Sequence, residues 1–135
     1  MMFADTSAIV AILTDEPERK LLSGALSRGG GRTTSPIVRL ETSIVLARRL
    51  DIDPVDAEEL FKEFLEMAAV SVIQINDPIA ISAVEAPQKY GRGRHPATLN
   101  FADCLSYACA KAFRTTLLYK GKDFSQTDIK AAVRA

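Results

Sequence analysis

The chain has 135 residues, 47% of them hydrophobic and 25% charged, a composition typical of a soluble globular protein and not of a disordered one. Seventeen basic residues balance seventeen acidic ones, so no overall charge indicates a nucleic-acid partner, although a local basic patch can still bind one. No apolar run approaches the ~20 residues of a membrane span, and no secretion signal is found. We therefore expect a cytoplasmic protein without a membrane partner, folded as one domain over residues 1–135.

The chain has too few cysteines and histidines for a zinc site. It contains two cysteines and one histidine, whereas a structural zinc ion takes about four such ligands. Cys104 and Cys109 lie on one predicted helix and point in different directions, so they do not bridge each other, and we expect reduced thiols. We assign no catalytic role to His95 from the sequence alone.

The most informative stretch is residues 1–14, whose only charged side chain is Asp5. Residues 2–4 predict a short buried strand, and residues 8–13 predict a helix that is apolar on nearly every side. Asp5 or Thr6 can cap that helix, because a short polar oxygen accepts a bond from an otherwise unpaired N–H. Asp5 is thus expected at the carboxyl end of a central strand, where open α/β sheets bind ligands. An unpaired carboxylate there costs roughly several kcal/mol, so we expect a cation or hydrogen bonds to compensate it.

The next elements are a helix, a turn and a strand. Residues 17–27 predict a helix, and the glycines at 29–31 end it. Threonines favour a short strand over residues 32–34. The apolar face of the helix over residues 17–27 is expected to consist of Leu21, Leu22 and Leu26.

A second anomalous carboxylate lies on the helix predicted over residues 36–50. Ser35 followed by Pro36 is a strong helix start, with serine as the N-cap and proline at the first helical position. Helical spacing predicts that Glu41 shares the inward face with apolar side chains. That inward face is expected to consist of Ile37, Leu40, Ile44 and Ala47.

The middle of the chain carries structure and no chemistry that we can assign. The Asp53–Pro54 pair starts another amphipathic helix, and residues 69–75 predict a strand because they are rich in β-branched residues. Asp77 and Pro78 then start a helix that reaches about residue 89. The apolar face of the helix that begins at residue 54 is expected to contain Val55, Leu60, Phe61, Phe64 and Leu65.

Two further acids lie near the end of the chain. A helix is predicted after Asn100, with Asp103 in its first turn, where the helix dipole favours negative charge. Helix capping is therefore an alternative role for Asp103. Residues 115–119 predict the last strand, and Asp123 follows it just as Asp5 follows the first strand.

Alternation of strands and helices predicts right-handed crossovers that build a mostly parallel sheet. In such a sheet the anomalous acids can converge on one edge, where crowded carboxylates need a cation among them. Oxygen ligands without histidine or cysteine favour Mg²⁺ or Mn²⁺, and such sites commonly act on phosphate esters. The candidate metal ligands are Asp5, Glu41 and Asp103, and Asp123 is an additional candidate. Thr6 and Ser7 are expected either to hold these acids by hydrogen bonds or only to cap the helix.

Four stretches together carry a resemblance that covers nearly the whole chain, in the same order and spacing. They are residues 2–13 (MFADTSAIVAIL), the helix of residues 36–48 with Glu41, residues 99–104 (LNFADC) and residues 117–129 (LLYKGKDFSQTDI). In these stretches the chain resembles PIN-domain ribonucleases, and more closely the VapC-type toxins of bacterial toxin–antitoxin modules.

The resemblance implies a PIN-like domain, that is, a three-layer α/β/α sandwich around a mostly parallel central sheet. It also implies a Mg²⁺- or Mn²⁺-dependent endoribonuclease that cleaves RNA phosphodiester bonds, a homodimer, and inhibition by a cognate VapB-type antitoxin. It assigns metal ligation to Asp5 and Asp103, with Glu41 beside them and Asp123 completing the catalytic acids. The chain departs from the pattern at one point, because many PIN domains carry the fourth acid where this chain has Gly121. Asp128 is the other candidate for that acid, or else it caps a final short helix.

Basic residues near these acids are candidates for contact with the RNA backbone, because RNA that approaches an acidic site needs nearby cations. The candidates are Arg92, Arg94, Lys120 and Lys122.

Two other functions remain open at this stage. A receiver-type phosphoacceptor domain needs a pair of acids after the first strand, where this chain has Asp5 alone. A non-catalytic PIN-like binding protein would keep its acids for structure only.

Overall fold

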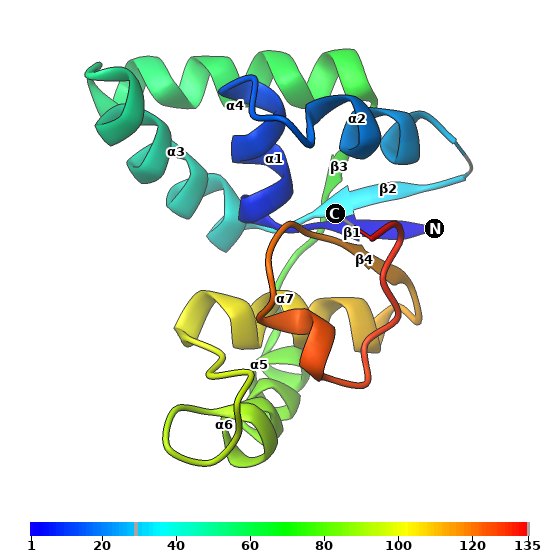
Figure 1. The fold of residues 1–135 in the computed structure, drawn as a ribbon. Helices are drawn as coiled ribbons and strands as arrows, with labels where there is room; N and C mark the ends of the chain where they lie inside the picture. The colour runs from blue at the N-terminus through cyan, green and yellow to red at the C-terminus, as the bar shows by residue number, and fades with distance from the viewer. Residues whose placement is uncertain (29, 135) are drawn as a thin grey trace.

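The computed structural model describes residues 1–28 and 30–134, and over these residues the chain builds a parallel four-stranded sheet (Figure 1). The strand order is β3-β2-β1-β4. In register, Phe3 lies opposite Thr33 on one side and Leu117 on the other. The first strand is therefore an inner strand of the sheet, as its three apolar residues predict. The strands are β1 (Met2–Ala4), β2 (Arg32–Thr34), β3 (Ser71–Val72) and β4 (Thr116–Leu118).

Helices cover both faces of this sheet, so the predicted three-layer α/β/α sandwich is confirmed (Figure 1). One face carries α1 (Thr6–Leu13), α2 (Arg19–Ser27), α3 (Pro36–Leu50) and α4 (Pro54–Ala68). The other face carries α5 (Asp77–Ala83), α6 (Glu85–Tyr90), α7 (Phe101–Ala112) and the 3₁₀ helix η1 (Phe124–Gln126). Within the described residues, none of the helices is both long enough and apolar enough to cross a membrane.

The core forms where the helices meet the sheet. Phe3 and Leu117 are almost completely buried in the sheet, and Ile9, Leu22 and Phe61 are buried in the helices above it. Cys104 and Cys109 are both buried free thiols, as predicted. Burial raises the pKa of Cys109 to about 11, so this thiol stays protonated and packs as a small apolar group.

The inward face predicted for α3 is wrong. Leu40 and Ile44 are 60% and 45% exposed, whereas Thr42, Ser43 and Leu46 are buried. Polar residues can face the core here because a short hydroxyl can bond to its own helix: Ser43 Oγ donates to the Arg39 carbonyl at 2.8 Å. Leu40 and Ile44 of α3 therefore lie on the protein surface and not in the core.

Several predicted boundaries also shift. The strand predicted over residues 69–75 is reduced to Ser71–Val72, because Ala69 takes a left-handed backbone conformation (φ 53°) that ends α4. The helix predicted from residue 77 to about 89 is two helices, α5 and α6, since Pro87 lacks the N–H that would continue the helical ladder. Of the side chains expected inside, Leu21 and Val55 are exposed. The predicted glycine stop begins at Gly29, which lies outside the described residues.

Candidate active site

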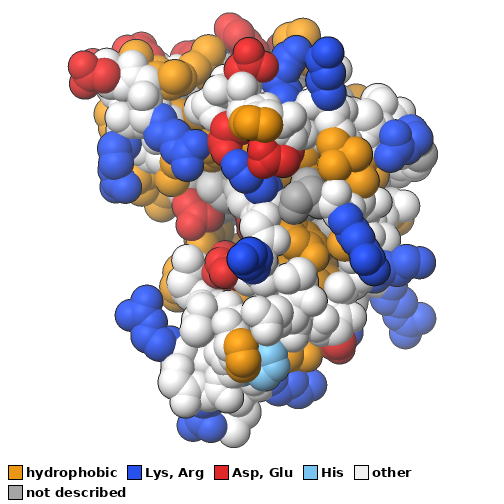
Figure 2. Space-filling view, in the orientation of Figure 1, with side chains coloured by type: hydrophobic (Ala, Val, Ile, Leu, Met, Phe, Trp, Pro, Cys, Tyr) orange, Lys and Arg blue, Asp and Glu red, His pale blue; other side chains and the backbone are white. Residues whose placement is uncertain are grey.

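A cavity of about 310 Å³ opens beyond the carboxyl ends of β1 and β4, between α1, α3 and α7. Figure 2 shows acidic and basic side chains gathered around a hollow between the two helix layers. The charged side chains that line the cavity are Asp5, Glu16, Glu41, Arg49, Asp103 and Lys120. Three of these acids, Asp5, Glu41 and Asp103, are far apart in the sequence and line the same cavity, as predicted for the carboxyl edge of a parallel sheet.

Asp5 is the most buried of these acids, with only 3% of its surface exposed. It follows β1 and is the N-cap of α1, and its Oδ2 accepts hydrogen bonds from the Ser7 backbone N–H (3.0 Å) and from Ser7 Oγ (2.7 Å). Its other oxygen, Oδ1, accepts a 2.8 Å bond from Ser106 Oγ in α7. The carboxylate is thus fixed in one orientation by hydroxyls from two helices, and Ser7 holds the acid while Asp5 itself caps the helix.

Asp103 combines the two roles that the sequence left open. Its backbone N–H donates to Asn100 Oδ1 at 2.8 Å, and its Oδ2 accepts from the Asn100 backbone N–H at 3.1 Å, which completes a capping box. The same side chain lines the cavity. The capping box therefore sets the direction of the carboxylate, and Oδ1 has no part in the capping.

Glu41 reaches the cavity from the middle of α3 and is half-buried. Next to it lies Thr6, whose Oγ1 is buried and makes no hydrogen bond of standard geometry with the described residues. Burial raises the pKa of Glu41, the Thr6 hydroxyl lowers it, and the nearby Asp5 charge raises it further. The Thr6 hydroxyl therefore lies close enough to Glu41 to act on the charge of its carboxylate.

Burial has the largest effect on the pKa of Asp103, and the neighbouring acids add to it. Burial raises the pKa of this carboxyl to about 7, the Asn100 backbone N–H opposes the shift, and the charges of Asp5, Asp123 and Glu41 add to it. Without a counter-charge, Asp103 therefore holds a proton over much of the range below neutral pH. A cation placed among the carboxylates would displace that proton.

The donor set of the cavity has the chemistry of a hard divalent cation, because it offers carboxylate and hydroxyl oxygens and neither histidine nor cysteine. Across residues 1–28 and 30–134, no three acids, cysteines or histidines already lie close enough to form a complete metal-binding cluster. Mg²⁺ commonly keeps several of its waters and takes only one or two carboxylates directly. The open arrangement of Asp5, Glu41 and Asp103 fits that mode of binding.

The two candidates for the fourth acid lie outside the cavity lining. Asp123 is exposed, yet its charge acts on Asp103. Asp128 does not cap the last helix, as one alternative held, because η1 ends at Gln126 and Asp128 instead accepts bonds from Tyr107 and Lys111. Gly121 does line the cavity, with φ at +105°, a conformation that residues with side chains rarely adopt.

The predicted RNA-contact residues separate into two groups. Lys120 lines the cavity, and its backbone N–H donates to Ser7 Oγ at 3.0 Å. Arg92, Arg94 and Lys122 are exposed and do not line it.

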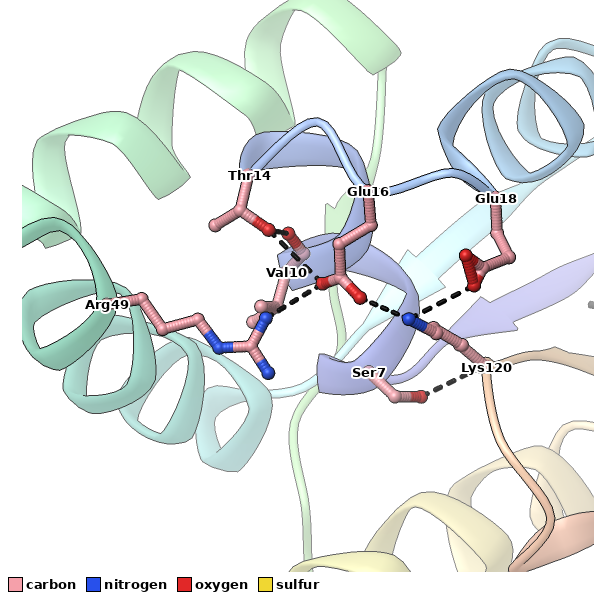
Figure 3. A network of polar contacts seen from close by, with 7 residues as sticks. All are labelled: Ser7, Val10, Thr14, Glu16, Glu18, Arg49 and Lys120. Atoms are coloured by element: carbon pink, nitrogen blue, oxygen red, sulfur yellow. Dashed lines mark hydrogen bonds and ion pairs between the residues drawn. The ribbon is translucent and has the colours of Figure 1, made fainter.

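Three residues of the site were missed by the sequence analysis, namely Glu16, Arg49 and Ser106. Figure 3 shows Glu16 between Arg49 of α3 and Lys120 of the segment after β4. Ser106 follows Asp103 by three positions and so lies on the same side of α7, a spacing that could have identified it. No local pattern distinguishes Glu16 or Arg49 from an ordinary surface charge.

Comparison with known proteins gives the family. The model of the PIN domain family matches residues 2–130. A ribonuclease VapC of Mycolicibacterium smegmatis is 44% identical over 130 residues, which cover 96% of this chain and 98% of the relative. Among solved structures, VapC20 of Mycobacterium tuberculosis, a toxin described as cleaving the sarcin–ricin loop, superposes with a TM-score of 0.78 at 21% identity over the full length of both chains.

A toxin–antitoxin complex from Klebsiella pneumoniae superposes with a TM-score of 0.73 at 18% identity, again over the full length of both chains. These two structural matches support the fold alone. The family follows from the sequence matches, which favour neither a receiver domain nor a non-catalytic protein. The chain belongs to the PIN domain family and, within it, to the VapC ribonucleases.

Proposed function

We propose that the chain is a Mg²⁺- or Mn²⁺-dependent endoribonuclease that hydrolyses RNA phosphodiester bonds as the toxin of a toxin–antitoxin pair. The observation that carries the proposal is the convergence of Asp5, Glu41 and Asp103 on one cavity from three separate elements. Burial, together with the charges of Asp5, Asp123 and Glu41, raises the pKa of Asp103, which supports a cation among the acids. The relatives named ribonuclease VapC support RNA as the substrate.

Each acid has a distinct part in this proposal. Asp5, Glu41 and Asp103 would hold the ion, with Thr6 and Ser7 as supporting hydroxyls and Asp123 as a more distant acid that adds charge. When bound, such an ion would activate water and neutralise negative charge on the phosphoryl oxygens. Ser7 and Ser106 orient Asp5, and the capping box orients Asp103. Asp103 must lose its proton before it can act as a ligand, so activity is expected to fall below about neutral pH.

Cleavage of RNA by the purified chain tests the proposal directly. Labelled RNA is incubated with Mg²⁺ or Mn²⁺, with and without EDTA, and the cut ends are mapped. Cleavage should need the metal, stop with EDTA, and disappear in Asp5→Asn and Asp103→Asn. If both variants remain folded and still cleave, these acids are not the catalytic ones.

We also propose two protein partners. The first is a VapB-type antitoxin that acts as the inhibitor, which is supported by the relatives named ribonuclease VapC and is consistent with the toxin–antitoxin complex that shares the fold. Growth arrest on expression of this chain, relieved by the product of a neighbouring gene, would establish that relationship. Arrest that no neighbouring product relieves would contradict it.

The second proposed partner is another copy of the chain, which would form a homodimer. Leu40 and Ile44 of α3 and Phe101 of α7 line one surface cavity and are 60%, 45% and 76% exposed. We define Leu40, Ile44 and Phe101 as the apolar stripe. Exposed apolar side chains grouped in this way are typical of a protein interface, and we propose that a second copy of the chain covers the stripe.

We further propose that residues 1–135 form one domain, since a single sheet gathers strands from both ends of the chain.

A further inference from the structure

One carboxylate at the cavity rim holds two cations from distant parts of the chain (Figure 3). Glu16, between α1 and α2, accepts a 2.8 Å bond from Arg49 of α3 through Oε2 and an ion pair from Lys120 Nζ through Oε1. Thr14 Oγ1 also donates to Oε2, at 3.2 Å. The two cations lower the pKa of Glu16, so the carboxylate is charged at neutral pH. Arg49 and Lys120 are therefore held side by side.

The two cations are more exposed than the carboxylate that pairs with them. The Glu16 side chain is 19% exposed, against 51% for Arg49 and 33% for Lys120. Both cations are therefore more accessible to an anion in the cavity than Glu16 is. Arg49 bonds to Glu16 through one terminal nitrogen, so its other N–H groups remain as donors.

The same network reaches the catalytic acids. The Lys120 backbone N–H donates to Ser7 Oγ, which in turn donates to Asp5 Oδ2. All of these residues line the same cavity. The two cations therefore line the same cavity as the carboxylates that would hold the ion, which is the arrangement needed to seat a phosphate beside a hydrolytic centre.

An RNA phosphate that enters this cavity needs cationic side chains to bind it. The cavity lining contains four acids, Asp5, Glu16, Glu41 and Asp103, which repel a phosphodiester. Arginine and lysine are the side chains that bind phosphate oxygens most effectively. Arg49 and Lys120 are the basic residues among those that line the cavity.

We propose that Glu16 is a positioning residue that holds Arg49 and Lys120 as a two-cation clamp for an RNA phosphate at the mouth of the carboxylate cavity. The proposal rests on the ribonuclease function proposed above and adds the place where the substrate backbone is held. Glu16 acts through the two cations and does not touch the RNA. Glu18, which pairs with Lys120 at 3.0 Å and makes no ion pair with Arg49, does not share this role.

Matched substitutions separate positioning from simple charge. Glu16→Gln and Glu18→Gln each remove one negative charge next to Lys120, but Glu16→Gln alone also releases Arg49. Asp15→Asn is the control, because Asp15 pairs with Arg19 on the surface and does not line the cavity. Each is placed in an Asp103→Asn background with EDTA, so that a fluorescein-labelled single-stranded RNA is bound and not cut, and affinity is measured by anisotropy over a range of salt.

We expect Glu16→Gln to weaken RNA binding about five- to tenfold, because the two cations are no longer held in position for charge-assisted bonds to the phosphate. The slope of log affinity against log salt should also fall, by about 0.7 for each phosphate of a single strand that the protein no longer neutralises. Glu18→Gln should bind RNA at least as tightly as the parent, since it removes a competing charge, and Asp15→Asn should not change the affinity.

Two results would overturn the proposal. If Glu16→Gln and Glu18→Gln both bind RNA more tightly than the parent, and to the same extent, then both acids only compete with the phosphate. Weaker binding by Glu16→Gln with an unchanged salt slope and a lowered Tm would mean that Glu16 only stabilises the fold. The ribonuclease function is tested separately: it is wrong if the unsubstituted chain binds RNA but does not cut it with Mg²⁺ or Mn²⁺. If the Asp103→Asn parent does not bind RNA at all, both proposals are wrong.

Discussion

Ser106 and Asp5 are 101 positions apart in the chain, and the hydroxyl of one donates a 2.8 Å hydrogen bond to the carboxylate of the other. Both side chains are buried, with 2% and 3% of their surfaces exposed. The bond joins α7 on one face of the sheet to the carboxyl end of β1. It therefore makes the direction of the most buried acid dependent on the position of a distant helix.

Removal of this hydroxyl should weaken metal binding more than it weakens the fold. We expect Ser106→Ala to lower the affinity for Mn²⁺ by about tenfold, because side chains that orient metal ligands commonly contribute that much. Calorimetric titration with Mn²⁺ measures the effect. Ser82→Ala is the control, since the Ser82 hydroxyl donates to the Ile79 carbonyl of its own helix. If Ser106→Ala binds Mn²⁺ as tightly as the unsubstituted chain does, the prediction is wrong.

Asp103→Asn should remove activity and stabilise the metal-free protein. The asparagine keeps an oxygen that can accept the Asn100 backbone bond, and it removes a buried charge that three other acids repel. We expect Tm in EDTA at pH 8 to rise by a few degrees, since about 1 kcal/mol shifts Tm by several degrees in a domain of this size. Thermal unfolding followed by circular dichroism measures it, and a lower Tm would show that the charge of Asp103 stabilises the fold.

The stability of the metal-free chain should depend on pH through the same carboxyl. Its pKa is about 7 when folded and 3.8 as the reference for the unfolded chain, so the folded state binds more protons between these values. The free energy of unfolding contributed by Asp103 is therefore highest at the acid end, falls as the pH rises from about 4 to about 7, and levels off above that. The raised pKa of Glu41 acts in the same direction.

Unfolding measured in EDTA from pH 5 to pH 8.5 tests this dependence. The difference in Tm between Asp103→Asn and the unsubstituted chain should be largest at pH 8.5 and small at pH 5, where Asp103 is already protonated. Saturating Mn²⁺ should reverse the trend, because metal and protons compete for the same oxygen atoms. A constant difference across this range would mean that Asp103 does not titrate there.

The apolar stripe should control the oligomeric state. Leu40→Glu places a charge in the centre of the proposed interface, so we expect the dimer to dissociate into monomers. Light scattering coupled to size exclusion measures the mass. Met67→Glu is the matched control, since Met67 is 89% exposed on α4 and lies outside the stripe, and a dimer that survives Leu40→Glu would place the interface elsewhere.

The acids of the site could be predicted from the sequence because each breaks a local pattern. Asp5 follows a short apolar strand, Glu41 lies among apolar residues and Asp103 follows a cap residue. These signals are local, and the parallel topology then brings the positions together at one edge of the sheet. The roles of these acids as metal ligands remain predictions until the variants are measured.

The rest of the site depends on tertiary packing that no local pattern encodes. Glu16, Arg49 and Lys120 meet only because α3 and β4 both approach the segment after α1. The inward face of α3 was predicted wrongly for a related reason. Leu40 and Ile44 are as apolar as core residues, and only the packing of the helix shows that Thr42 and Ser43 face inward in their place.

The last residues of the chain have a consequence for how it can be shortened. Leu117 of β4 donates its N–H to the Lys130 carbonyl and accepts a bond from the Ala132 N–H, both at 2.9 Å. The tail thereby occupies the outer hydrogen-bonding groups of a strand that has β1 as its neighbour on the other side. A chain cut after Gln126 would leave those groups open to pair with the same strand of another molecule. Such a truncation should aggregate even though it keeps every acid of the cavity.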